Sequence, residues 1–151
     1  MLSLFYKHHH YFYLPVKILE EIQKDKKQKL SKQLLLDFFK KEFILESGFR
    51  LSVQNITNDL FLVTVAFKTQ ETAIAFKLKI ATYKELLPPW IVFPDLFQGV
   101  PRWNQGIEED YGVNHWLPFW QSLNQQEKQE YMDKYDCPLD WKNWLEEHKC
   151  S

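Results

Sequence analysis

The chain has 151 residues, of which 45% are hydrophobic and 26% charged, and its formal net charge is −1. This is the length of one typical domain with room for a substantial core, so we expect a single domain over residues 1–151. Aromatic residues reach 17%, which argues against a disordered chain and favours a well-packed core or an adhesive surface.

Membrane and secretory segments are not expected. No apolar stretch approaches the roughly 18 residues that a transmembrane helix needs. Lys7 and three histidines interrupt the apolar residues at the amino end, and no cleavage-site pattern follows them. Cys137 and Cys150 are too few for a disulfide framework, and neither has metal-ligand spacing. We therefore expect a cytoplasmic protein that contacts no membrane and holds no cofactor.

Charge is distributed unevenly along the chain. Residues 1–50 carry +4, residues 51–84 carry +2 and residues 85–151 carry −7. The lysines of the first third are spread over helix-like sequence without aromatic interleaving, which argues against a nucleic-acid partner. The acidic last third indicates either a basic partner or a surface that serves solubility.

The first half of the chain predicts helices followed by strands. The aromatic residues before Pro15 predict a strand or an extended arm, in which the adjacent histidines 8–10 point to alternate faces and cannot easily share one metal ion. Pro15 is placed to start a helix, and Ser31 to cap a second one that Gly48 would end. From Arg50 the apolar period changes from 3.6 to 2, which predicts an antiparallel meander of strands at 51–54, 60–67 and 74–80.

Residues 87–120 form the most unusual stretch. They hold five of the seven prolines, three of the four glycines and four of the six tryptophans. We predict a short edge strand at 90–93, a loop at 99–106 and a helix from about residue 108, with further helices after Asn124 and Asp140. The fold class is therefore predicted as α+β: an antiparallel sheet of three to four strands covered by helices, with a Trp-rich helical C-terminal part.

The hypothesis of a catalytic site depends on Glu109, Asp110 and His115. Carboxylates and histidine can transfer protons or ligate a metal ion. Asp110 and His115 are five residues apart, however, which fits poorly with the i, i+4 spacing of ligands on one helical face, and no known catalytic motif is present. These acids are by default residues of a helix N-terminus, where negative charge is stabilising. A small metal-assisted hydrolase remains an alternative.

A second hypothesis assigns the same stretch to partner binding. Most tryptophans have apolar neighbours at core-like spacing, whereas Trp103 stands between polar residues and is the one expected to be exposed. Arg102 can pair with the acids at 108–110, stack on Trp103 or contact a partner. The predicted partner-contact residues are Arg102, Trp103, Glu108, Glu109 and Asp110.

The C-terminal half combines PPWIVFP, the loop RWNQGIEEDY, a W-x3-W pair and a final P-x2-W-x2-W. In this combination, residues 87–145 resemble small bacterial proteins of the polymorphic-toxin immunity type. The matching residues are Pro89, Trp90, Pro94, Trp103, Gly106, Glu109, Asp110, Tyr111, Trp116, Trp120, Tyr131, Trp141 and Trp144. The resemblance implies a protein that binds one cognate toxin domain and blocks it, and it implies no catalytic residues. A phage or secretion-system adaptor is a further alternative.

Overall fold

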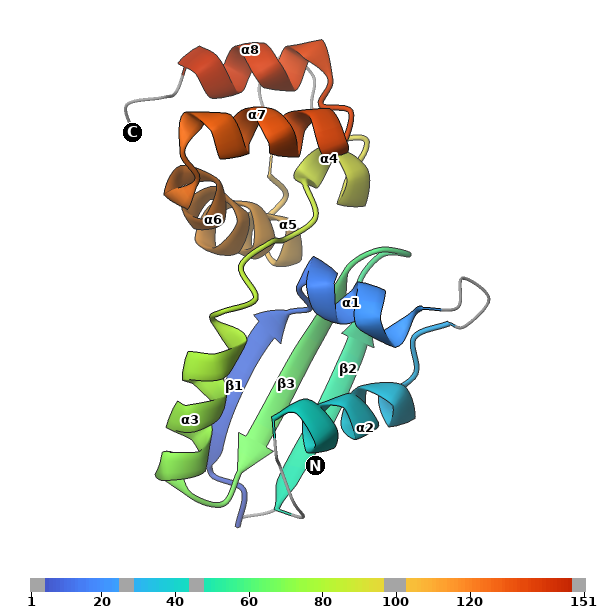
Figure 1. Ribbon diagram of the computed structural model, residues 1–151, viewed down its shortest axis with the longest axis vertical. Helices are drawn as coiled ribbons and strands as arrows, with labels where there is room; N and C mark the ends of the chain where they lie inside the picture. The colour runs from blue at the N-terminus through green and yellow to red at the C-terminus, as the bar shows by residue number, and fades with distance from the viewer. Residues whose placement is uncertain (1–4, 25–28, 44–47, 97–102, 148–151) are drawn as a thin grey trace. The chain divides into compact units, whose positions relative to one another are not determined.

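A computed structural model describes residues 5–24, 29–43, 48–96 and 103–147 of the chain (Figure 1). The fold class is α+β, as predicted, with a three-stranded antiparallel sheet and helices. In the described part, no helix is both long enough and apolar enough to cross a membrane.

The chain divides into two compact units, which we describe separately. The first unit comprises Met1–Ile56 with Leu60–Glu85, and the second comprises Thr57–Asp59 with Leu86–Ser151. The expectation of a single domain stays a prediction.

The sheet of the first unit has the strand order β1-β3-β2, with both pairs antiparallel. Its strands are β1 (His8–Tyr13), β2 (Phe49–Asn55) and β3 (Phe61–Phe67). The amino-terminal segment is thus a strand, and it takes the sheet position that the predicted meander gave to residues 74–80. Strands β2 and β3 lie where the period-2 pattern predicted them.

The prediction of a strand at residues 74–80 is wrong, because this segment belongs to the helix α3 (Gln70–Ile80). Thr69 caps the helix by accepting a hydrogen bond from the backbone N–H of Thr72 at 3.2 Å. The alternating apolar residues fall on two helical faces. Phe76 and Ile80 are 2% and 5% exposed, whereas Ile74 and Leu78 are 50% and 69% exposed.

Three helices cover one face of the sheet: α1 (Val16–Ile22), α2 (Lys32–Glu42) and α3. In Figure 1, α1 and α2 lie in front of the strands and α3 runs alongside β1. Ser31 caps α2, as predicted, by accepting a hydrogen bond from the backbone N–H of Leu34. The core between these helices and the sheet contains Phe12, Leu14, Ile18, Ile22, Leu35, Phe39, Phe43, Leu51, Phe61, Val63, Val65, Phe67, Phe76 and Ile80.

Gly48 does not end α2, which is a second correction. The helix ends at Glu42, with Phe43 donating its backbone N–H to the carbonyl of Phe39. Gly48 lies directly before β2 and has a φ of +141°, a backbone conformation that L side chains rarely adopt. Glycine at this position therefore allows the backbone conformation in which the chain enters β2.

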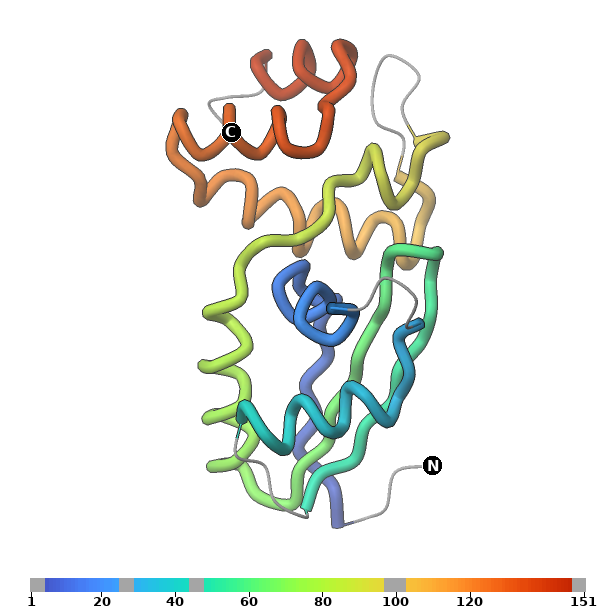
Figure 2. The backbone as a smooth tube through the Cα atoms, turned by 45° about the vertical axis from the view of Figure 1, so that its right-hand side comes forward, coloured from blue at the N-terminus to red at the C-terminus, as the bar shows by residue number. Residues whose placement is uncertain are grey.

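The second unit is helical. It contains α4 (Pro89–Val92), α5 (Ile107–Glu109), the π-helix η1 (Asp110–Trp116), α6 (Leu117–Ser122), α7 (Gln125–Lys134) and α8 (Leu139–Glu147). Helices α7 and α8 run side by side (Figure 2). The helix predicted after Asn124 is α7, and Asn124 and Glu127 form a capping box at its start.

The predicted edge strand at residues 90–93 is a one-turn helix instead. Pro89 takes the first helical position of α4, where the absent N–H has no partner to lose. The tryptophan of this turn, Trp90, packs at ring-centroid distances of 5.9, 6.2 and 5.6 Å on Trp116, Tyr131 and Trp141. Tertiary packing thus overrides the strand preference of the apolar run.

The helical state of α3 can be tested by comparing two apolar positions that a strand would place on the same face. Replacing Phe76 with Ala removes a ring that contacts Phe39, Phe43 and Phe67, and should cost about 3–5 kcal/mol of unfolding free energy in urea titrations. Leu78→Lys changes an exposed position and should stay within about 0.5 kcal/mol of wild type. Similar losses for both variants would contradict the helix.

Candidate functional site

The described parts of the stretch, residues 87–96 and 103–120, are fixed to the helices of the second unit by aromatic side chains. The hydroxyl of Tyr111 donates to the carbonyl of Leu87, and that of Tyr131 donates to the carbonyl of Leu86. The indole N–H of Trp90 donates to the carbonyl of Tyr135 at 2.9 Å. Prolines and aromatic rings thus hold this stretch as a scaffold.

Helices α5, η1 and α6 form one continuous helical run whose middle is a π-helix. Its wider hydrogen bonding is seen where the N–H of Leu117 meets the carbonyl of Gly112, five residues earlier. Pro118 follows directly, and a proline inside a helix has no N–H to donate and crowds the carbonyl four residues before it. A π-helix of this length is rare, and π segments are frequent at functional sites.

The π-helix brings Asp110 and His115 together, which corrects the expectation that their spacing separates them. His115 Nε2 lies 3.4 Å from Asp110 Oδ2. The other oxygen, Oδ1, accepts a hydrogen bond from Asn114 Nδ2 at 3.0 Å. A five-residue spacing places two side chains on one face of a π-helix, since each turn takes in about one more residue than in an α-helix.

Burial decides the protonation of His115. Desolvation lowers the pKa of this histidine from its usual 6.5, and the neighbouring carboxylate of Asp110 raises it by a smaller amount. The neutral imidazole is therefore the favoured form in the folded protein near neutral pH. The contact with Asp110 is then a polar contact to a neutral ring, and it becomes an ion pair only after protonation in acid.

Trp103 is half-buried, so the expectation of an exposed ring is not met. Its ring packs on Gly112 of the π-helix, where a built Cβ would lie 2.1 Å from Trp103 Cζ3. It also meets Trp141 edge-on at a centroid distance of 6.1 Å. Of the predicted contact residues, Trp103 is thus largely engaged in internal packing.

The three predicted acids have different surroundings. Glu108 is half-buried, and its Oε2 accepts a hydrogen bond from the backbone N–H of Asn104 at 3.1 Å. Glu109 is exposed, whereas Asp110 is tied to Asn114 and His115. Arg102 lies outside the described residues. As predicted, a helix begins at these acids, and Glu108 and Asp110 stabilise its first turns.

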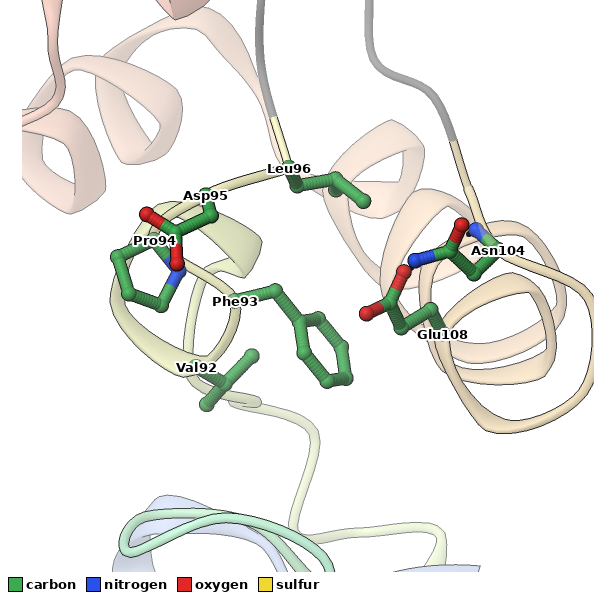
Figure 3. A pocket seen from close by; sticks show the side chains of 7 residues that line it. All are labelled: Val92, Phe93, Pro94, Asp95, Leu96, Asn104 and Glu108. Atoms are coloured by element: carbon green, nitrogen blue, oxygen red, sulfur yellow. Dashed lines mark hydrogen bonds between the residues drawn. The ribbon is translucent and has the colours of Figure 1, made fainter.

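A cavity of about 380 Å³ lies beside Glu108 (Figure 3). Its lining residues are Val92, Phe93, Pro94, Asp95, Leu96, Asn104 and Glu108. The ring of Phe93 lies in the middle of the cavity, with Asp95 on one side and Glu108 on the other. Within the described residues, neither the Asp95 carboxylate nor Oε1 of Glu108 has a hydrogen-bonding partner. The cavity therefore combines an apolar floor with two carboxylates.

Sequence reasoning missed Asp95. It directly follows Pro94 at the end of the apolar run that forms α4, and it is exposed. The only local signal was an acidic residue after a proline, which is also a common turn signal. Glu108, on the other side of the cavity, lies thirteen positions later in the sequence, so their facing positions depend on the tertiary fold.

The described residues contain no group of three or more His, Cys, Asp or Glu side chains that could hold a metal ion. The pair Asp110 and His115 therefore falls short of the three protein ligands of a typical catalytic zinc site. Cys137 is buried, and burial raises the pKa of its thiol to about 12. This thiol is protonated at neutral pH and is a poor nucleophile.

Comparisons of the chain with protein-family models, with curated proteins and with solved structures find no match in any of the three.

The packing of Trp103 on the π-helix predicts a clash in Gly112→Ala. Although alanine favours helices, the added Cβ should destabilise the protein by about 1–3 kcal/mol in urea titrations, because the indole would have to move. In a Trp103→Ala background the same substitution should be neutral or stabilising. An equal penalty in both backgrounds would show that the ring does not set the requirement for glycine.

The lowered pKa of His115 predicts an acid-sensitive fold. Because the folded state disfavours the proton, unfolding free energy should be greatest above pH 6.5 and should decline as pH falls through the lower pKa of the folded state. His115→Gln should show a smaller decline between neutral and mildly acidic pH in thermal melts. The exposed His9→Gln is the matched control, and an unchanged pH profile of His115→Gln would contradict this assignment.

Proposed function

We propose that the protein is an immunity protein that neutralises a cognate bacterial toxin by direct contact between the second unit and a basic surface of the toxin. The observation that carries the proposal is the cavity with Asp95 and Glu108 on opposite sides of an apolar floor. A lysine or arginine side chain has the matching chemistry, with an apolar stem and a cationic end. Such a residue on the partner would place its stem on Phe93 and its charge between the carboxylates.

The charge of the second unit as a whole supports a basic partner. The described residues between 86 and 147 include eleven Asp or Glu residues and three Lys residues. The exposed acids are Asp95, Glu109, Glu127, Glu130, Asp133, Asp136, Asp140, Glu146 and Glu147. A surface of one sign attracts an oppositely charged partner and raises the association rate at low salt.

The proposed partner-contact residues are centred on the cavity, which differs from the set predicted from the sequence. Glu108 and Glu109 stay in it, and Asp95 joins it from across the cavity. Trp103 and Asp110 act chiefly by holding the helical run that carries Glu108. Arg102 stays a predicted contact residue without a structural description.

A metal-assisted hydrolase that uses Asp110, Glu109 and His115 is the second candidate, favoured by the contact that the π-helix creates between Asp110 and His115. It requires a further ligand from outside the described residues or from a substrate. Stoichiometric zinc binding by the purified chain, lost in His115→Ala, would support this candidate.

The immunity proposal predicts that a gene next to this one encodes a toxin domain, and this domain is the partner used in the test. Asp95→Asn combined with Glu108→Gln removes both charges of the cavity, while glutamine can still accept the hydrogen bond from Asn104. Calorimetric titration should show an affinity about ten to one hundred times weaker, the effect of one or two charge-assisted hydrogen bonds.

The matched control is Glu146→Gln with Glu147→Gln, which removes the same charge from exposed positions at the end of α8. It should keep the wild-type affinity within about threefold, since charges outside the proposed contact stay exposed to solvent in the complex and contribute little to binding energy. Wild-type affinity in the cavity variant would exclude the cavity as the contact. A wild-type protein that neither binds this toxin nor protects cells from it would exclude the immunity function.

A further inference from the structure

The sheet of the first unit has one face that its helices leave uncovered. Side chains alternate along a strand, so the neighbours of the core residues point away from α1, α2 and α3. The register places them in rows across the three strands, with His9, Ala66 and Arg50 in one row. The next row is Tyr11, Thr64 and Ser52. We call these six residues the open face.

Positive charge gathers at one end of the open face. Arg50 lies 5.0 Å and Lys68 5.5 Å from the ring centroid of Tyr6. Arg50 lies on β2, Lys68 directly follows β3, and Tyr6 lies in the segment before β1. Both cations thus lie within cation–π distance of the ring of Tyr6.

No described carboxylate neutralises these cations. None of the three strands contains Asp or Glu, and neither Arg50 nor Lys68 forms an ion pair within the described part of the chain. Both side chains are exposed. Two like charges held around one ring repel each other, and an incoming anion would relieve that repulsion.

Aromatic and small residues occupy the rest of the open face. Tyr11 is 47% exposed, in the row next to that of Arg50. His9, in the same row as Arg50, is exposed, while Thr64 and Ala66 between the outer strands are small. Thr64 is half-buried and Ala66 is fully buried, so the exposed side chains of the open face are those of the two outer strands. Single-stranded nucleic acids are bound by exposed side chains of this kind, with bases stacked on aromatic rings and phosphates held by Arg and Lys.

We propose that the open face binds single-stranded nucleic acid, with bases stacked on Tyr11 and phosphates held by Arg50 and Lys68. An acidic protein is the less favourable occupant, because the centre of a protein interface is usually apolar and no exposed residue of the open face is aliphatic. The sequence argued against a nucleic-acid partner because the lysines are spread along the helices. The sheet overrides that argument by bringing cations from different strands to one ring. This inference is independent of the toxin-binding proposal.

The test uses the full chain and fluorescence anisotropy with a labelled single-stranded oligonucleotide of about 12 nucleotides, within the usual site sizes. At about 50 mM salt, the wild type should bind, and Arg50→Glu with Lys68→Glu should weaken binding at least about tenfold. The dependence of log affinity on log salt should become shallower by about 1.4 in the double variant, the value for two phosphate contacts on a single strand. Tyr11→Ala should weaken binding about tenfold through lost stacking. Circular dichroism confirms that each variant is folded.

Lys29→Glu with Lys32→Glu is the matched control, since both lysines are exposed at the amino end of α2, on the covered side of the sheet. It should change affinity by less than about threefold. An equal loss in this control, or no binding by the wild type, would overturn the proposal. So would equal affinity for an abasic oligonucleotide, which keeps the phosphates without the bases, or for poly-glutamate.

Discussion

The second unit depends on the hydrogen bonds that join Trp116, Tyr131 and the carbonyl of Leu86. The fully buried indole of Trp116 donates to the Tyr131 hydroxyl at 3.0 Å, and this hydroxyl donates to Leu86. A buried donor that lost its acceptor would cost about 1–3 kcal/mol. The relay therefore ties the π-helix, α7 and the segment that leads into α4. The residues that line the cavity belong to α4, α5 and the segments next to them, which follow or adjoin the elements that these hydrogen bonds join.

The π-helix is the second constraint, and it links packing to the candidate site. Gly112 provides the surface on which Trp103 lies, and the wide turn brings Asp110 to His115. Glu108 is positioned one turn before, through its hydrogen bond to Asn104. An unusual backbone in a partly buried helix is retained when the surrounding packing stabilises it. Here the surrounding rings of Trp103 and Trp141 supply that packing.

The two units have surfaces of opposite character. The second unit presents an excess of exposed carboxylates and a cavity with an apolar floor lined by Asp95 and Glu108, which suits a cationic side chain. The first unit presents cations and rings on a sheet face without acids, which suits an anionic, planar ligand. The near-zero net charge of the whole chain hides both features. Association with either kind of partner would be salt-dependent, because exposed charges are screened over about a Debye length.

Some elements could be predicted from the sequence because their signals are local. Ser31 and Asn124 cap helices through bonds to residues three positions away, and the β-branched run of β3 defines a buried strand. The placement of most tryptophans in the core also followed from their apolar neighbours. The strand predicted at residues 74–80 failed because Phe76 and Ile80 satisfy both period 2 and the i, i+4 spacing of a helix. The Thr69 cap was the signal that could have separated the two.

The sequence by itself determined the fold class, the capped helices, the strands β2 and β3 and the acidic character of the last third. Only the tertiary structure decided that Asp95 faces Glu108, that Asp110 meets His115 and that Arg50 and Lys68 share the ring of Tyr6. The physical reason is that capping, alternation and charge are properties of neighbouring residues. Cavities and charge clusters arise from distant segments, or from a backbone form such as the π-helix that packing selects.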